Sequence, residues 1–145
     1  MDALIQSLVQ ANFAPERIAP QASMAQYTTL RIGGPAEVMV NIHSADEIAV
    51  ALRAAKQADA PVTIIGNGSN LLVSDKGLNG VAILLDSGFD GEIEVDGTVL
   101  LAPAGKKLSA VCAAACAAGL TGLEFAYGIP GSVGGAVYMN AGAYG

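Results

Sequence analysis

Apolar and polar positions near the N-terminus predict a helix followed by loops and β-structure. Residues 3–11 fit a short amphipathic helix, because their apolar side chains recur on one side. Residues 12–26 predict an irregular segment, since two prolines interrupt it. The next run, residues 27–32, is rich in β-forming residues and stops at Gly33-Gly34-Pro35.

Residues 37–65 predict a strand–helix–strand unit. Alternation over residues 37–41 is typical of a strand, and Ser44 followed by Glu47 forms a capping box that opens a helix. The apolar stripe of this helix is expected at Ile48, Ala51, Leu52 and Ala55. The short apolar run over residues 62–65 has the composition of a buried strand. The two strands should form a parallel pair joined by a right-handed crossover.

Further strands and a second helix are predicted downstream. Residues 71–74 form a short β-like run, and residues 81–85 have the composition of another buried strand. Two β-rich runs flank Asp96-Gly97, which predicts a hairpin over residues 92–101 with these two residues as its turn. Residues 108–118 predict a helix that is ended by a glycine.

These elements predict an α+β chain organised as two lobes. The character of the sequence changes near Ser87-Gly88, so a first lobe is expected over residues 1–86 and the start of a second over residues 87–145. The hydrophobic fraction of 52% and the mean hydropathy of +0.48 are high. Because no apolar stretch approaches the ~20 residues needed to cross a bilayer, we expect a buried sheet covered by helices and no membrane insertion.

Charge and cysteine content argue against several function classes. The formal net charge is −6 and no basic cluster exceeds Lys106-Lys107, which argues against nucleic-acid binding. Cys112 and Cys116 share a helix face and are expected to be reduced core residues without a metal, because zinc needs more ligands. His43, the single histidine, is remote in sequence and is expected in a loop or at a strand end. The lack of a disulfide pattern and of a secretory signal indicates a cytoplasmic protein.

The first candidate binding site is the loop Gly66-Asn67-Gly68-Ser69-Asn70. Two glycines spaced by one residue allow positive φ and a close approach of the backbone to a ligand. Successive main-chain N–H groups in such a turn can form an anion-binding nest, so a phosphate or pyrophosphate can be held without a lysine. The Rossmann and Walker patterns do not match, because Leu71 replaces the third glycine and no Gly-Lys-Ser/Thr follows. An ordinary strand–turn–strand connection explains the same residues equally well.

The second candidate site is the glycine- and alanine-rich stretch from residue 128 to residue 145. Its interspersed Ile, Val, Met and Tyr residues are typical of a packed segment and not of a flexible linker. Small residues at 131–132 and 134–136 would let the backbone lie against a flat ligand or against another backbone. A tightly packed bend between lobes is the alternative interpretation.

These motifs together resemble the UDP-N-acetylenolpyruvoylglucosamine reductase family. The resemblance rests on GNGSNLL at residues 66–72, GIPGSVGGA at residues 128–136 and NAGAYG at residues 140–145. An upstream segment, TTLRIGGPA at residues 28–36, is also similar to the opening motif of that family. The two glycine motifs in this order and at this spacing make the resemblance specific, whereas either motif alone would be weak evidence.

The resemblance implies a two-lobed α+β FAD-binding fold of the vanillyl-alcohol oxidase (PCMH) type, truncated before the substrate domain. A noncovalent FAD would lie between the lobes, with residues 66–70 around its pyrophosphate, residues 128–136 along the flavin and residues 140–144 close by. The cofactor-binding residues that the resemblance implies are Gly66, Asn67, Gly68, Ser69, Asn70, Leu71, Gly128, Ile129, Pro130, Gly131, Ser132, Gly134, Gly135, Ala136, Asn140, Gly142, Ala143 and Tyr144.

The resemblance also implies an activity. In that family a hydride passes from NADPH through the flavin to UDP-N-acetylglucosamine enolpyruvate, giving UDP-N-acetylmuramate for peptidoglycan synthesis. The family's proton-donating serine and its assisting arginine and glutamate belong to later motifs that have no counterpart in this sequence, so we assign no catalytic residue. Two alternatives stay open: a non-catalytic module that binds a flavin or nucleotide, and another FAD oxidoreductase of the same fold.

Overall fold

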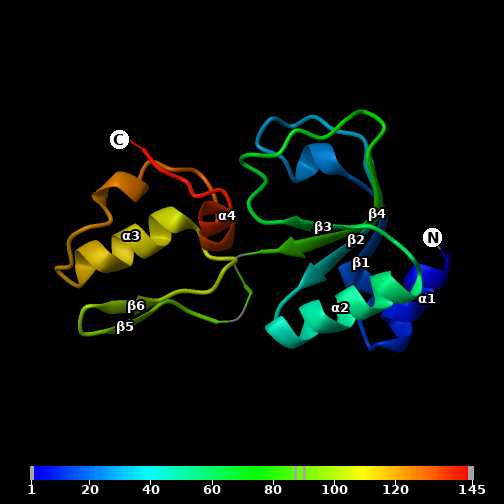
Figure 1. Cartoon of the computed structure of the whole chain (residues 1–145), viewed down its shortest axis with the longest axis horizontal. Coiled ribbons are helices and arrows are strands. Elements are labelled where there is room, and N and C mark those ends of the chain that lie inside the picture. The colour runs from blue at the N-terminus through cyan, green and yellow to red at the C-terminus, as the bar shows by residue number, and fades with distance from the viewer. Residues whose placement is uncertain (1, 87, 90, 144–145) are drawn as a thin grey trace.

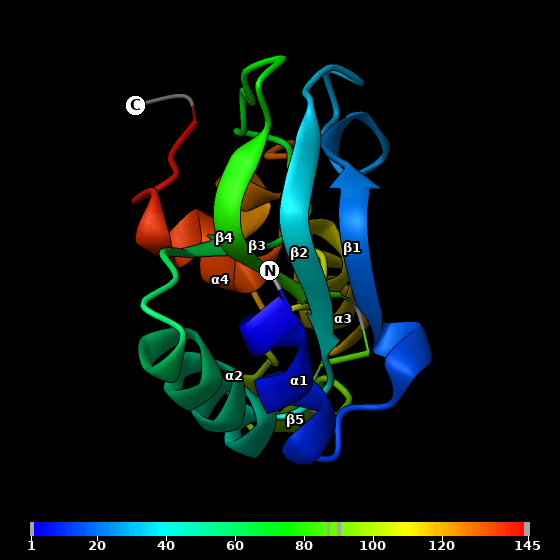
Figure 2. The ribbon, with the colours of Figure 1, turned by 90° about the vertical axis from the view of Figure 1, so that its right-hand side faces the viewer.

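A four-stranded mixed sheet forms the first half of the protein (Figures 1 and 2). The computed structural model describes residues 2–86, 88–89 and 91–143. The strands lie in the order β1 (Ile18–Ser23), β2 (Pro35–Ile42), β4 (Leu78–Leu85) and β3 (Val62–Ile65). β1 runs antiparallel to β2, whereas β2 and β3 both run parallel to β4. The run predicted as a buried strand over residues 81–85 therefore belongs to a central strand, and its Val81, Ala82 and Ile83 are buried.

Two helices cover one face of the sheet and lie below it in Figure 1. They are α1 (Asp2–Gln10), as predicted near residues 3–11, and α2 (Ala45–Gln57). Alternate residues of β2 and β4 face them, because side chains of a strand point to opposite faces in turn. The core between helices and sheet includes Leu4, Leu8, Val38, Val40, Ile42, Ala51, Ala54, Ala55, Val81 and Ile83.

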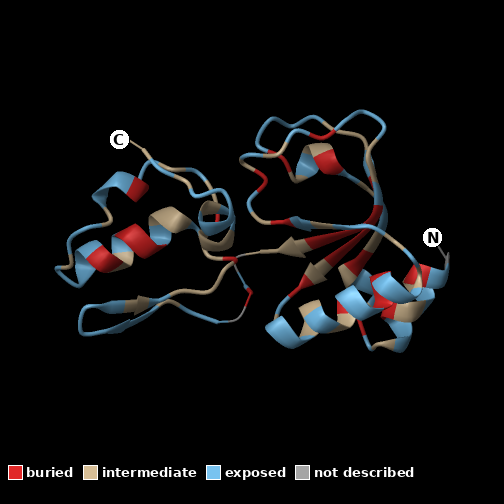
Figure 3. Ribbon diagram, viewed as in Figure 1, coloured by how far each residue is buried: buried red, intermediate tan, exposed pale blue. Residues whose placement is uncertain are grey.

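Loops cover the opposite face of the sheet and lie above it in Figure 1. Met39 of β2 and Ala82 of β4 point to this side, where they pack with Met24, Ile65 and Val73 in a smaller core. Figure 3 shows that buried positions run through the sheet and into these loops. The sheet is thus covered on both faces, and the loop side carries the first candidate site.

The segment before β2 differs from its prediction. β1 and the short 3-10 helix η1 (Pro15–Arg17) lie where an irregular stretch was expected. Pro20 is tolerated in β1 because β1 is an edge strand, where a residue without an N–H group does little harm. Residues 27–32, predicted as β-structure, form turns after η2 (Met24–Gln26). The hydroxyl of Thr28 donates to the carbonyl of Ile32 at 3.0 Å and closes these turns.

The strand predicted over residues 62–65 is present as β3, but it is not a buried strand. It lies at an edge of the sheet, with Val62 38% exposed and Ile64 58% exposed, and only Ile65 is buried. β4 lies between β2 and β3, so the predicted parallel pair is not a pair of hydrogen-bonded neighbours. The β-like run over residues 71–74 forms no strand and continues the loop after β3. The handedness of the crossover stays a prediction.

The predicted helix start at Ser44 is confirmed. The hydrogen bonds of the Glu47 side chain and the exposure of Leu52 complete the description of this helix. Ser44 Oγ accepts a hydrogen bond from the Glu47 N–H group at 3.4 Å. The Glu47 carboxylate accepts from the N–H group of His43 at 2.7 Å and pairs with Arg17, whose Nη1 lies 2.8 Å from Glu47 Oε1. His43 is an exposed residue just after β2, as predicted. Leu52 was wrongly placed on the buried stripe and is 41% exposed, because Ala54 takes that side of the helix.

The second half of the protein lies beside the sheet in Figure 1. Its elements are β5 (Glu94–Asp96), β6 (Val99–Leu101), α3 (Leu108–Ala117), η3 (Glu124–Ala126) and α4 (Val133–Tyr138). The hairpin is confirmed, but Asp96 pairs with Val99, so its turn is Gly97-Thr98 and not Asp96-Gly97. Gly97 has φ of 57°, which fits the first turn position of a type II′ hairpin.

α3 begins and ends as predicted, with Gly119 at φ of 69° just after its cap. Cys112 is buried on this helix, as predicted, whereas Cys116 is exposed, so its prediction as a core residue is wrong. Both are free thiols. The helix α4 was not predicted, because glycine is a poor helix former. The predicted lobe boundary stays a prediction, and Ser87 lies outside the described residues. None of the helices in the described part of the chain is long and apolar enough to span a membrane.

The Arg17–Glu47 pair generates a prediction about stability. Hydrogen bonds from Arg17 are the main reason why the pKa of Glu47 is lowered from 4.5 to about 2, against the raising effect of burial. A carboxyl with a lowered pKa in the folded state stabilises the fold above its unfolded pKa. This contribution should be lost as the pH falls from about 4.5 towards about 2.

We expect Glu47→Gln to lower the free energy of unfolding at pH 7 by about 1–2 kcal/mol. Urea unfolding at pH 7 and at pH 3 measures this, with Glu94→Gln on the exposed hairpin as the control. The difference between wild type and Glu47→Gln should shrink at the lower pH. An equal difference at both pH values would contradict the assignment.

Candidate functional site

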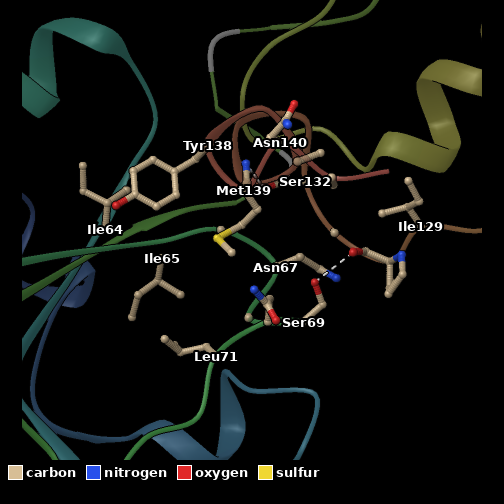
Figure 4. Close-up of a pocket in the computed structure, with 18 of the residues that line it drawn as sticks. Ile64, Ile65, Asn67, Ser69, Leu71, Ile129, Ser132, Tyr138, Met139 and Asn140 are labelled. Atoms are coloured by element: carbon tan, nitrogen blue, oxygen red, sulfur yellow. Dashed lines mark hydrogen bonds between the residues drawn. The ribbon is translucent and has the colours of Figure 1, made fainter. Parts of the chain in front are cut away.

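Two glycine-containing loops from the two halves of the chain meet at one place. The first, residues 66–70, follows β3, and the second, residues 129–132, precedes α4. Ser69 Oγ donates a hydrogen bond to the carbonyl of Pro130 at 2.9 Å (Figure 4). A Cβ atom on Gly66 would overlap Ser132 Oγ, and one on Gly131 would lie 3.2 Å from Ser69 Oγ. The absence of side chains at these glycines therefore lets the two backbones approach each other.

The first loop also packs against the turns over residues 27–29. Gly68 has φ of +64°, and a Cβ atom at this position would overlap the carbonyl oxygen of Tyr27. The N–H group of Thr29 donates to the carbonyl of Gly68 at 3.1 Å. Gly34 fits against the carbonyl of Asp75 in the same way. The glycines that stop the predicted β-run thus hold the loops together on this face of the sheet.

The main-chain N–H groups of the first loop, at Asn67, Gly68, Ser69 and Asn70, have no hydrogen-bond acceptor among the described residues. Unpaired N–H groups need a partner, because leaving them desolvated costs free energy. A bound anion supplies acceptors for them. Phosphate binding by this loop stays a prediction.

The start of α4 does not offer a second anion site. Ser132 is 3% exposed, and its Oγ caps the helix by accepting from the Gly135 N–H group at 3.3 Å. The N–H group of Val133 donates to the carbonyl of Lys106 at 2.8 Å, and that of Gly134 donates to the carbonyl of Ala104 at 2.9 Å. These groups are used to attach α4 to the segment before α3. The second loop therefore contributes a surface and not a nest.

A cleft of about 530 Å³ opens between the two loops (Figure 4). Its volume lies in the usual range for small-molecule sites. Apolar side chains from both halves of the chain line it, and Figure 4 shows Tyr138 and Met139 on the side of Ile64. These apolar lining residues are Ile64, Ile65, Leu71, Ile129, Tyr138 and Met139.

A second cleft of about 530 Å³ is more polar and shares Gly66 and Asn67 with the first. It also contains Thr28, Arg31, Asp86 and Lys107. Gly66 and Asn67 line both clefts, so the loop of residues 66–70 borders both spaces.

The structure brings most of the predicted site residues to the first cleft. These are Gly66, Asn67, Gly68, Ser69, Asn70, Leu71, Ile129, Pro130, Gly131, Ser132, Gly135, Ala136, Asn140 and Gly142. Gly128, Gly134 and Ala143 lie outside its lining, and Gly134 packs against Ala104 instead. Tyr144 lies outside the described residues. The contacts of all these residues with a ligand stay predictions.

Sequence reasoning missed several lining residues. Ile64 and Ile65 were expected in a buried strand, and only the edge position of β3 exposes Ile64 to the cleft. Tyr138 and Met139 come shortly after the glycine motif at residues 128–136. Their position in the sequence could therefore have indicated that they line the same cleft. No group of three or more His, Cys, Asp or Glu side chains that could hold a metal occurs among the described residues.

Comparison with known proteins decides the family. The model of a family described as an FAD binding domain matches residues 36–145. The chain belongs to this FAD-binding domain family. Its α+β fold is accordingly of the FAD-binding type predicted above.

Curated relatives and a solved structure carry the same enzyme name. The chain is 50% identical over 122 residues to UDP-N-acetylenolpyruvoylglucosamine reductase of Latilactobacillus sakei, covering 84% of the chain and 40% of that protein. It is 43% identical over 145 residues to the reductase of the same name from Bacillus subtilis, covering 100% and 47%. The crystal structure of UDP-N-acetylenolpyruvylglucosamine reductase from Thermus caldophilus matches with a TM-score of 0.66 and 36% identity, over 87% of the chain and 42% of that structure. The chain thus spans less than half the length of these relatives.

The residues present fit an FAD. The unpaired N–H groups of residues 67–70 match the acceptors of a pyrophosphate. The apolar walls suit a flat ring system, and the glycines allow the backbone to approach it closely. The loop of residues 66–70 borders both clefts. The pyrophosphate and a flat ring of FAD would therefore each meet residues of suitable chemistry among those described.

We predict that Gly68→Ala abolishes FAD retention. The new Cβ atom would overlap the Tyr27 carbonyl and force the nest out of shape. Gly97→Ala is a matched control, because Gly97 has a similar φ of +57° but open space around it. Flavin absorbance of the purified, FAD-loaded chain measures retention. Retention of FAD by Gly68→Ala at the level of Gly97→Ala would refute the role of this loop.

We also predict that Gly66→Ala and Ser132→Ala are not additive. The Cβ atom at position 66 would push Ser132 Oγ away from the Gly135 N–H group, so both changes remove the same cap of α4. Each single variant should lose about 1 kcal/mol of unfolding free energy, and the double variant little more. Chemical unfolding of the four proteins measures this. Fully additive losses would show that the two loops do not touch in solution.

Proposed function

We propose that this chain is the FAD-binding part of an enzyme that uses NADPH to reduce UDP-N-acetylglucosamine enolpyruvate to UDP-N-acetylmuramate. The names of the relatives and the Thermus caldophilus structure support the reaction. The reaction belongs to the formation of peptidoglycan precursors, and we place it in the cytoplasm. The observation that carries the proposal is the set of unpaired N–H groups over residues 67–70, in a loop that borders two clefts.

Bound FAD would supply hydride transfer, which is the chemistry of the cofactor, while the protein supplies placement. The backbone of residues 67–70 would hold the pyrophosphate, because its donors are free and the loop is fixed by the turn at Tyr27. Ser132, Gly135 and Ala136 would let α4 lie close to the cofactor. We expect noncovalent binding, since neither cleft is lined by a His or Cys side chain among the described residues.

Apolar side chains would exclude water from one end of the cofactor. Ile64 is exposed at the edge of the sheet, Tyr138 is 88% exposed on α4, and Figure 4 places both at the same side of the cleft. Burying such side chains against a flat ring removes apolar surface from water and stabilises the complex. Their exposure is therefore what we expect of side chains that would pack against a flat ring of the cofactor.

Among the described residues, the serine and asparagine side chains at the cleft are unsuited to donate a proton, and the hydroxyl-bearing side chain of Tyr138 is 88% exposed. Reduction of the enolpyruvyl group needs an acid within hydrogen-bond reach of the reacting carbon. The hydroxyl of Ser69 is engaged with the Pro130 carbonyl, and that of Ser132 is buried in the cap of α4. Asn67 and Asn140 carry amides, which are not acids at neutral pH. We therefore expect the isolated chain to bind FAD but not to turn over substrate.

A hybrid enzyme tests the proposed reaction. The chain aligns with the Bacillus subtilis reductase over all of its 145 residues, which are 47% of that protein. We expect a hybrid in which it replaces the matching part to oxidise NADPH above the background oxidase rate of the flavin when the enolpyruvyl sugar nucleotide is present. The isolated, FAD-loaded chain should show only the background oxidase rate of the flavin.

The controls separate the possible failures. A hybrid carrying Gly68→Ala should lose activity together with FAD, whereas one carrying Gly97→Ala should keep both. If a folded hybrid holds FAD but shows no substrate-dependent NADPH oxidation, the proposed reaction is wrong and another FAD oxidoreductase or a binding module takes its place. Substrate-dependent oxidation by the isolated chain would overturn the expectation that it lacks a proton donor.

A further inference from the structure

A network of hydrogen bonds fixes the turn at which the chain leaves the sheet. Asp86 follows the last residue of β4, and its Oδ2 accepts a hydrogen bond from Asn41 Nδ2 of β2 at 2.9 Å. Its Oδ1 accepts from the N–H group of Gly88 at 2.8 Å, and its carbonyl accepts from the N–H group of Phe89 at 3.1 Å. The side chain of Asp86 therefore joins the ends of two strands to the turn that follows them.

The segment before α3 rests directly on this turn. Gly105 is buried, and a Cβ atom on it would overlap the carbonyl oxygen of Asp86 and lie 2.9 Å from Phe89 Cβ. No side chain fits between Gly105 and the turn. A shift of the turn is therefore transmitted to Gly105 and to its neighbours in the chain.

The neighbours of Gly105 hold α4. The carbonyls of Ala104 and Lys106 accept the hydrogen bonds from the N–H groups of Gly134 and Val133. The residue before them, Ser132, faces Gly66 across the contact between the two loops. The contacts thus lead without a gap from Asp86, through Gly105, to the wall of the cleft that α4 forms.

We propose that Asp86 is a positioning residue that sets the spacing between α4 and the loop of residues 66–70. This inference rests on the proposed FAD binding, because that spacing sets the width of the first cleft, where the cofactor would bind. Asp86 performs this role through Gly88 and Gly105 and not through contact with a reacting atom. Loss of its side chain would leave the donors of Asn41 and Gly88 without their acceptor and release the turn.

The test compares Asp86→Ala, Asp86→Asn and Glu47→Gln with the wild-type chain. FAD affinity is measured by flavin fluorescence, and amide hydrogen exchange of Val133 and Gly134 is measured without FAD. Asp86→Ala should weaken FAD binding about tenfold and speed both exchanges about tenfold. Asp86→Asn keeps an oxygen for the Gly88 N–H group and should show smaller changes of the same kind.

Glu47→Gln is the control that distinguishes a positioning role of Asp86 from a general loss of stability. Its partner Arg17 also donates to the carbonyl of Asn41, so the change weakens the fold beside Asn41 while Glu47 itself lines neither cleft. We expect it to leave FAD affinity and the exchange of Val133 and Gly134 unchanged. Equal effects of Glu47→Gln and Asp86→Ala on both measurements would overturn the proposal.

Two further outcomes are decisive. If Asp86→Ala weakens FAD binding while the exchange of Val133 and Gly134 stays at the wild-type rate, Asp86 acts directly from the second cleft and the positioning role is wrong. If the wild-type chain binds no FAD, the proposed function fails, while accelerated exchange in Asp86→Asn still supports the link from Asp86 to α4. Unchanged exchange in both Asp86 variants overturns that link.

Discussion

The contact between the two glycine-containing loops is the constraint on which the rest of the structure depends. Ser69 binds Pro130, and Gly66 leaves just enough room for the hydroxyl of Ser132. The contact joins the end of β3 to the start of α4, so the two halves of the chain meet at their backbones. Side chains larger than hydrogen at these glycines would separate the halves and widen the cleft between them.

The two faces of the sheet are covered by different kinds of structure. On one face, α1 and α2 bury the alternate residues of β2 and β4 and supply much of the apolar core. On the other face, loops replace helices, and loops are where binding residues usually lie on a rigid scaffold. The edge position of β3 completes this division, because it leaves Ile64 available to the cleft while Ile65 anchors the strand in the loop-side core.

Local patterns in the sequence predicted many helices and strands, but not which elements lie beside each other in the fold. Ser44 was identified as the cap of α2, and residues 81–85 as a buried strand, because capping and apolar composition are local properties. β1 was missed because Pro20 argues against a strand unless its place at the edge is known. The turn of the hairpin was shifted by one residue, since Gly97 fits either of two registers and only the pairing of Asp96 with Val99 selects one.

The sequence by itself determined the family and the glycines and small residues at which the two loops meet. These features depend on residue type at fixed spacing, which is readable without a fold. Only the tertiary structure decided that Gly68 lies against the carbonyl of Tyr27, that Gly66 and Asn67 line two clefts, and that Gly105 lies against the carbonyl of Asp86. Each of these contacts joins residues far apart in the chain, and no local pattern encodes which distant backbone will fill the space beside a glycine.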